Sequence, residues 1–163
     1  MLAFQAPPCT ARALAPALLP LLQTALGGAA AAGGTIVDMG IRWLCVPLPS
    51  AATCLAVHAD IAALTTLLAA SMADGLALYG AHGADGPADY EVRALLSEHG
   101  ALVEDPVTGS ANACIAHLLA GADYRVRQGT CLQRDGRVSV NFRDDHAWIG
   151  GACLTVIAGT ILA

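Results

Sequence analysis

The segment ANACIAHLL, residues 111–119, limits the possible folds of this chain more than any other stretch. We predict that it forms a helix whose first residues are Gly109 and Ser110. Nearly every face of that helix is apolar, so the helix has to be buried on all sides. The polar segment EDPVTGS comes directly before it. A buried helix with a polar start needs a cleft at that start.

The composition raises the question of a membrane protein, because 56% of the 163 residues are hydrophobic, 13% are charged, and the mean hydropathy is +0.59. A membrane-spanning helix needs about 20 continuous apolar residues. The longest apolar runs are too short or are interrupted by Pro16, Pro20 and Gln23. The two prolines also interrupt a stretch that imitates a secretory signal. We therefore expect one compact domain, residues 1–163, in the cytoplasm.

Charge and cysteine spacing narrow the possible partners. The net charge is -5, and the eight basic residues, all arginine, are scattered along the chain. This pattern offers no basic face to nucleic acid and repels anionic membranes, so we expect a small-molecule or protein partner. The six cysteines form no C-x-x-C pair and the histidines do not cluster, so we expect no metal site and mostly buried thiols.

Apolar and turn patterns predict an α+β fold with mostly antiparallel strands. Asp135–Gly136, between two alternating runs, predicts a hairpin. Residues 1–10 are typical of a connector. We predict helices over residues 12–26, 58–72 and 111–119, and strands over residues 42–48, 76–83, 90–96, 124–133 and 137–142, with two short tail strands that break at residues 150–151 and 158–159.

The segment EDPVTGSAN is the candidate site. Pro106 restricts the residue before it to an extended conformation, which holds the carboxylate of Asp105 outside the following helix. The first amides of a helix lack intrahelical partners and carry the positive end of its dipole, so the backbone over residues 108–111 is suited to bind a carboxylate. The alternative is a plain helix cap, in which Thr108 or Ser110 caps the helix and Asp105 is an exposed acid.

These residues also resemble a known family. EDPVTGSANA, GIRWLCVPL and YEVRALLSEHGALVEDP are similar to motifs of the PhzF family, the phenazine-biosynthesis isomerases and their relatives. The resemblance implies the carboxy-terminal half of a diaminopimelate-epimerase-like fold, in which a curled, mostly antiparallel sheet surrounds a central buried helix. It also implies proton transfer at carbon without a cofactor, in which Asp105 is the catalytic acid/base and the substrate is bound by Thr108, Gly109, Ser110 and Ala111.

The chain departs from the family pattern in three places. Family members are nearly twice as long, and their principal acid/base glutamate belongs to an amino-terminal half without a counterpart here; LAFQAPP is similar to the linker that follows that half. Leu95-Leu96-Ser97 replaces a Phe-Ala-Pro of the family pattern, which changes the expected pocket wall. We expect Glu104 to face solvent or an arginine rather than to replace the glutamate, since neighbours on an extended segment point to opposite faces.

Three functions follow as alternatives. The chain is an isomerase that is either truncated or works with a separate amino-terminal half, an isomerase that forms a homodimer so that two Asp105 carboxylates share one cleft, or a catalytically inactive module that binds small carboxylates. None of the three requires a cofactor.

Five further residues have an ordinary structural interpretation. We expect His117 and Trp43 to lie in the core and His99 to lie in a turn. We expect Arg127 and Gln128 at a solvated strand end.

Overall fold

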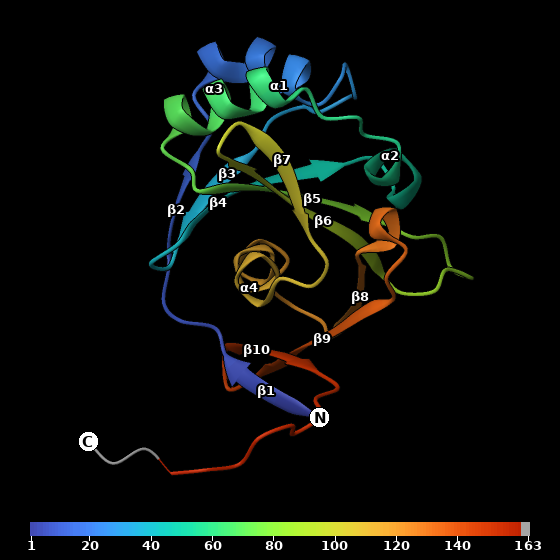
Figure 1. Ribbon diagram of the computed structural model, residues 1–163. Coiled ribbons are helices and arrows are strands. Elements are labelled where there is room, and N and C mark those ends of the chain that lie inside the picture. Colours follow the sequence, from blue (N-terminus) through green and yellow to red (C-terminus); the bar gives the residue numbers. More distant parts are fainter. Residues whose placement is uncertain (161–163) are drawn as a thin grey trace.

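The computed structural model of the chain describes residues 1–160, in which one curled sheet surrounds a central helix (Figure 1). This helix is α4 (Gly109–Leu118), and it begins at the predicted residue. Residues 111–116 of α4 are at most 1% exposed, so the helix is buried on every side, as its apolar sequence predicts. Alanine at three of these positions leaves room for the surrounding strands to approach closely. The expected α+β fold with a curled sheet is confirmed.

The sheet contains ten strands within the described residues, in the spatial order β1-β10-β9-β8-β6-β5-β4-β3-β2, with β7 paired to β6. Neighbouring strands are antiparallel except for β4 with β5 and β6 with β8. In chain order the strands are β1 (Leu2–Gln5), β2 (Thr10–Ala13), β3 (Thr35–Asp38), β4 (Arg42–Leu48), β5 (Gly75–Ala81), β6 (Tyr90–Glu98), β7 (Ala101–Asp105), β8 (Tyr124–Gln128), β9 (Gly136–Arg143) and β10 (His146–Gly151).

The two parallel connections place helices on opposite faces of the sheet. Helices α2 (Ala51–Leu55) and α3 (Ile61–Ser71) connect β4 with β5 and lie on the outer face, together with α1 (Leu19–Ala25) (Figure 1). Helix α4 lies between β6 and β8 in the chain and packs on the inner face. Two short 3-10 helices, η1 (Pro16–Leu18) and η2 (Thr130–Leu132), are also present. Within residues 1–160, no helix has the length and hydrophobicity needed to cross a membrane.

Strand β4 is buried on both faces of the sheet. Trp43 and Cys45 belong to the core around α4, whereas Leu44 and Val46 belong to the core that includes α1 and α3. A strand buried on both faces has a continuous apolar sequence, as RWLCVPL does. Gly75 of β5 leaves space for the indole of Trp43, since a β-carbon on it would lie 2.4 Å from the ring.

Three sequence predictions are wrong in part. Residues 12–26 do not form one helix: Arg12 lies in β2, and the helical part begins only at η1 because Pro16 and Pro20 are tolerated only in the first turn of a helix. The predicted strand over residues 124–133 ends with β8, because Gly129 turns the chain into η2 with a φ of 86°. The first tail strand exists as β10, but residues 152–160 contain no strand, and the end of the second predicted tail strand lies outside the described residues.

Candidate functional site

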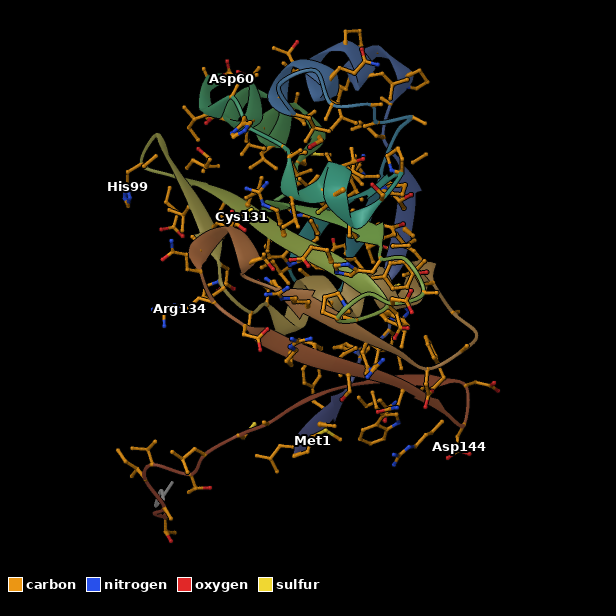
Figure 2. The ribbon with its side chains drawn as sticks, turned by 90° about the vertical axis from the view of Figure 1, so that its right-hand side faces the viewer. Met1, Asp60, His99, Cys131, Arg134 and Asp144 are labelled. Carbon is orange, nitrogen blue, oxygen red and sulfur yellow. The ribbon has the colours of Figure 1, made fainter. Side chains whose placement is uncertain are left out.

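Strand β7 carries Asp105 to the start of α4. The sequence did not predict this strand, which pairs with β6 through a tight turn at His99, where the φ of 52° confirms the expected turn and the side chain points away from the molecule (Figure 2). Pro106 follows the strand and has no amide hydrogen to continue the pairing. Helix α4 then begins with Thr108 as its N-cap residue, so the acid lies just before the helix, as predicted.

The first amides of α4 are without partners. No acceptor within residues 1–160 bonds to the amides of Gly109, Ser110 or Ala111, whereas the amide of Thr108 donates to Oε1 of Gln128 at 3.1 Å. These free amides carry the positive end of the helix dipole, which makes this end of α4 suited to an anion.

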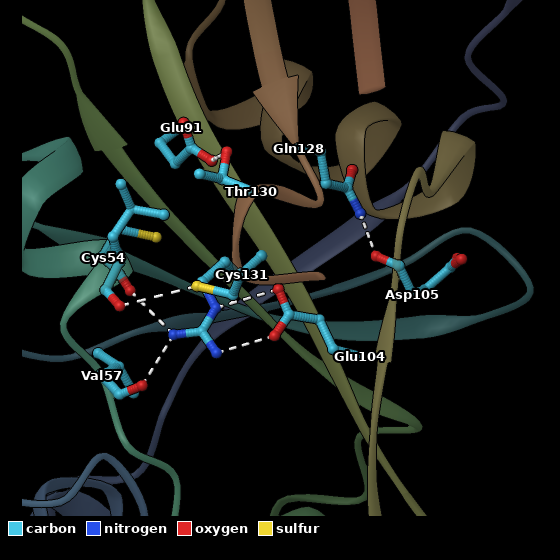
Figure 3. Close-up of polar contacts among 10 residues, drawn as sticks. Cys54, Val57, Glu91, Glu104, Asp105, Gln128, Thr130 and Cys131 are labelled. Atoms are coloured by element: carbon cyan, nitrogen blue, oxygen red, sulfur yellow. Dashed lines mark hydrogen bonds and ion pairs between the residues drawn. The ribbon is translucent and has the colours of Figure 1, made fainter. Parts of the chain in front are cut away.

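The side chain of Gln128 connects Asp105, Thr108 and Asn112 through hydrogen bonds. Its side chain is 0% exposed, its Oε1 also accepts from Nδ2 of Asn112 at 2.9 Å, and its Nε2 donates to the main-chain oxygen of Asp105 at 2.9 Å (Figure 3). The same Nε2 donates to Oγ1 of Thr108 at 2.9 Å, and that hydroxyl donates to Oδ2 of Asp105 at 2.6 Å. The hydroxyl of Thr108 therefore fixes the acid and does not cap the helix.

The prediction of a solvated strand end at Gln128 is wrong. Residues of a strand alternate between its two faces, and Tyr124, Val126 and Gln128 share the buried face of β8. Because the two apolar residues identify that face as the core face, the period of two was a signal that placed Gln128 inside. Arg127 lies on the opposite face, where its Nε is 3.3 Å from a carboxylate oxygen of Asp135.

Ser110 is oriented by the buried indole of Trp43. The indole Nε1 donates to Oγ of Ser110 at 3.1 Å, and Trp43 is 1% exposed, as expected for a core residue. An indole N–H can only donate, so the oxygen of the serine is the acceptor and its own hydrogen is available to another group. Ser110 therefore adds a hydroxyl donor to the free amides beside it.

A cleft of about 660 Å³ opens at the start of α4. Gly109 reaches this cleft, and a β-carbon on Gly109 would lie 3.2 Å from Cε1 of Phe4 in β1. The rest of the lining is mainly apolar and includes Leu2, Val107, Val138 and Ile149, with Asp135 and Arg137 among the polar residues. The cleft has room for a small molecule that reaches Gly109, whereas the other predicted site residues, Asp105, Thr108, Ser110 and Ala111, are not among those that line it.

Glu104 points to the opposite side of β7 and is bound by an arginine, as expected. Its two carboxylate oxygens accept from Nε and a terminal nitrogen of Arg93 at 3.1 and 2.8 Å, and the side chains are only 8% and 7% exposed (Figure 3). Burial by itself lowers the pKa of Arg93, but the hydrogen bonds and charge of Glu104 outweigh it, so the pKa lies above the usual value. Arg93 also donates to the main-chain oxygens of Cys54 and Val57.

His117 lies at the other end of α4 and takes no part in the site. It is half-buried, and its Nε2 is 3.0 Å from the main-chain oxygen of Pro7. The expectation that His117 lies in the core is wrong in part, because its ring has a hydrogen-bond partner but the residue is only half-buried and lines a second pocket.

A family model described as phenazine biosynthesis-like protein, PhzC-PhzF, matches residues 1–159. The chain belongs to this family. The match extends over β1, β7, α4 and the β8–β9 hairpin, so it includes every residue of the candidate site. The resemblance read from EDPVTGSANA is thereby confirmed.

Solved structures share the fold of this PhzC-PhzF chain. A PhzF-family phenazine biosynthesis protein from Bacillus anthracis has a TM-score of 0.68 at 16% identity and covers 90% of this chain and 56% of its own. A PhzF-family protein from Enterococcus faecalis has a TM-score of 0.61 at 20% identity, with coverages of 80% and 46%. A predicted epimerase from Pseudomonas aeruginosa has a TM-score of 0.63 at 20% identity, with coverages of 91% and 54%.

These neighbours confirm the expected diaminopimelate-epimerase-like fold. The PhzC-PhzF chain spans about half the length of the solved structures it matches. No match was found among curated proteins.

Proposed function

We propose that this protein acts as a PhzF-like isomerase or epimerase that moves a proton on a small carboxylate substrate without a cofactor. Membership of the family and the predicted epimerase among the structural neighbours support this class of reaction. The observation that carries the proposal is local: Thr108 fixes the carboxylate of Asp105 beside the free amides at the start of α4.

The substrate carboxylate binds at the start of α4. Its oxygens accept from the amides of Gly109 and Ser110 and from the hydroxyl of Ser110, whose hydrogen is free because Trp43 occupies the oxygen as a donor. The body of the substrate extends into the mainly apolar cleft that Gly109 lines. Such a site favours a small acid with an uncharged body.

Asp105 is the acid/base of the proton transfer. Its Oδ1, which no donor within residues 1–160 occupies, takes a proton from the carbon next to the substrate carboxylate. The C–H bond breaks, an O–H bond forms on Asp105, and the electron pair moves into the carboxylate to give an enediolate. The amides of Gly109 and Ser110 stabilise the negative charge that develops on these oxygens. Return of a proton to the other face, or to a conjugated carbon, completes the isomerisation.

We propose that the second proton-transfer group is supplied from outside residues 1–160. Glu104 is not available for this role, because Arg93 occupies both of its oxygens. We propose that the chain corresponds to the carboxy-terminal half of a PhzF protein and that it pairs either with a separate amino-terminal half or with a second copy of itself. In a homodimer, the second copy would bring its own Asp105 to the shared cleft.

A catalytically inactive carboxylate-binding module is the alternative. It is favoured by the same observation on Glu104, since one carboxylate in a site can bind and polarise an acid but cannot deliver a proton to its opposite face. The two functions differ in whether a bound acid exchanges its carbon-bound proton with water.

The test combines oligomeric mass, binding and proton exchange. The mass of the protein in solution is measured first, and amide NMR then follows Gly109 and Ser110 during titration with a panel of 2-amino and 2-hydroxy acids. Exchange of the proton next to the carboxylate is measured in deuterium oxide for the wild type and for Asp105→Asn. The control is Asp145→Asn, because Asp145 is exposed in the β9–β10 turn, where its φ of 62° also suits asparagine.

We expect exchange in the wild type and in the Asp145 variant and none in Asp105→Asn. If acids bind at Gly109 and Ser110 but their carbon-bound proton does not exchange, even with a separate amino-terminal half present, the result would support the binding module instead. A strict monomer would exclude the homodimer, and shifts that avoid Gly109 and Ser110 would refute both functions.

A further inference from the structure

Gln128 uses the whole hydrogen-bonding capacity of its amide group at this site. An amide side chain has two donor hydrogens and an oxygen with two lone pairs. Oε1 accepts from the amide of Thr108 and from Asn112, and Nε2 donates to the main-chain oxygen of Asp105 and to the hydroxyl of Thr108. A buried side chain with every position used has one orientation, because a flipped amide would face donors with donors and acceptors with acceptors.

This orientation determines the direction of the next two hydrogen bonds. A main-chain amide can only donate and a main-chain carbonyl can only accept, so the positions of Oε1 and Nε2 are fixed by Thr108 and Asp105. The hydroxyl of Thr108 accepts from Nε2, so its own hydrogen is directed to Oδ2 of Asp105. This bond holds the carboxylate of Asp105 in one orientation, and no donor within residues 1–160 bonds to its Oδ1, so the ionised group has Oδ1 available as an acceptor.

The fold gives the network little freedom to rearrange. Gly129, which follows Gln128, packs against the turn after Asp105, since a β-carbon on Gly129 would lie 2.7 Å from the main-chain oxygen of Pro106. Gly136, the register partner of Gln128 in β9, is almost as close, because a β-carbon on it would lie 2.9 Å from the same oxygen. Neither backbone can move toward the other to replace a lost side-chain bond.

We propose that Gln128 is a positioning residue which, through Thr108, holds the Asp105 carboxylate in one orientation with Oδ1 left free to accept, so that the site selects acids with a donor next to the carboxylate, the 2-hydroxy and 2-amino acids, over plain carboxylic acids. This inference rests on the part of the proposed function that places a carboxylate at the start of α4. It does not depend on whether proton transfer follows.

The test measures a ratio of affinities with two probes of matched size, lactate and propionate, which differ by one hydroxyl group. One hydrogen bond to a carboxylate should make lactate bind the wild type on the order of tenfold more tightly. Thr108→Val removes the hydroxyl and keeps the shape, and it should reduce the ratio to near one. Thr108→Ser restores the hydroxyl and should restore the ratio.

Gln128→Met tests the residue itself, and it should also reduce the ratio to near one while propionate binds within about threefold of its wild-type affinity. The control is Gln23→Met, because Gln23 is exposed on α1, remote in the chain from the site, and it should keep the wild-type ratio. If Gln128→Met does not fold, the two Thr108 variants still decide the question.

A ratio near one in the wild type, or a wild-type ratio in Thr108→Val, would overturn the inference. An equal loss of affinity for lactate and propionate in the folded variants would also overturn it, since loss of a purely structural residue would weaken the binding of both acids alike. If the wild type prefers lactate to propionate but shows no exchange of the carbon-bound proton, catalysis is refuted and the role of Gln128 is unaffected. Failure of the proposed function and failure of this inference therefore give different results.

Discussion

Loss of Arg93 should destabilise this protein more than loss of any exposed arginine. The guanidinium binds Glu104 through two nitrogens and also donates to the main-chain oxygens of Cys54 and Val57 at 3.2 and 2.8 Å. It thereby joins β6 and β7 to the segment around α2. Arg93→Met keeps the unbranched stem of the side chain and removes all of these bonds.

The expected loss in the free energy of unfolding follows from the buried groups that lose their partner in Arg93→Met. Removal of one partner of a buried ion pair costs about 3–5 kcal/mol, because the other charge stays buried without compensation. Each of the two carbonyl oxygens loses a donor as well, at about 1 kcal/mol each. We therefore expect a loss of roughly 5 kcal/mol, a large part of the total of about 5–15 kcal/mol for a domain. For a chain of this size it corresponds to a fall in Tm of roughly 10–20 °C.

Two further variants separate charge from packing. Glu104→Gln keeps the bonds from Arg93 to Cys54 and Val57, so it should cost less than Arg93→Met. The double variant with Arg93→Met and Glu104→Leu leaves no unpaired charge, so it should recover about 2 kcal/mol relative to Arg93→Met. Arg42→Met is the matched control, because Arg42 binds Asp74 in the same two-point manner at an exposed position.

The assay is thermal and urea unfolding followed by circular dichroism. A stabilising role of the buried Arg93–Glu104 pair is refuted if Arg93→Met loses no more stability than Arg42→Met, or if the double variant is less stable than Arg93→Met. Amide NMR of Gly109 and Ser110 in Glu104→Gln adds a functional measurement. Because Glu104 precedes Asp105 in β7, we expect weaker carboxylate binding in that variant.

Two other predictions concern pH and thiol chemistry. Hydrogen bonds from Arg42 lower the pKa of Asp74, so the stabilisation of the fold by this ion pair is present above the unfolded pKa of about 3.9 and is lost as pH falls through the folded value. Asp74→Asn should therefore lose slightly less stability than the wild type when the pH falls below about 4. Identical acid unfolding curves for the two proteins would contradict this. Burial raises the pKa of Cys54 to about 12, so Cys54 should react with a thiol reagent at pH 8 only on unfolding. The exposed Cys131 and Cys153 should be modified first. Equal modification rates of these three thiols in the native protein would contradict this.

The amino-acid sequence alone determined the central features of this fold. An apolar helix over residues 111–119 had to be enclosed, and the run RWLCVPL had to lie between two buried faces. Pro106 placed an acid immediately before the helix, because a proline restricts the residue before it and ends a strand. These are local properties of short segments, so they can be predicted without knowledge of the remaining chain.

The tertiary structure decided which residues complete the site. Gln128 is 20 residues from Thr108 in sequence and contacts it only because β8 lies beside β6, and Trp43 reaches Ser110 across 67 residues. Arg93 meets Glu104 through the pairing of β6 with β7, a strand that the sequence pattern did not reveal. The directions of these hydrogen bonds depend on which donors and acceptors the fold brings together, and no local pattern of residues contains that information.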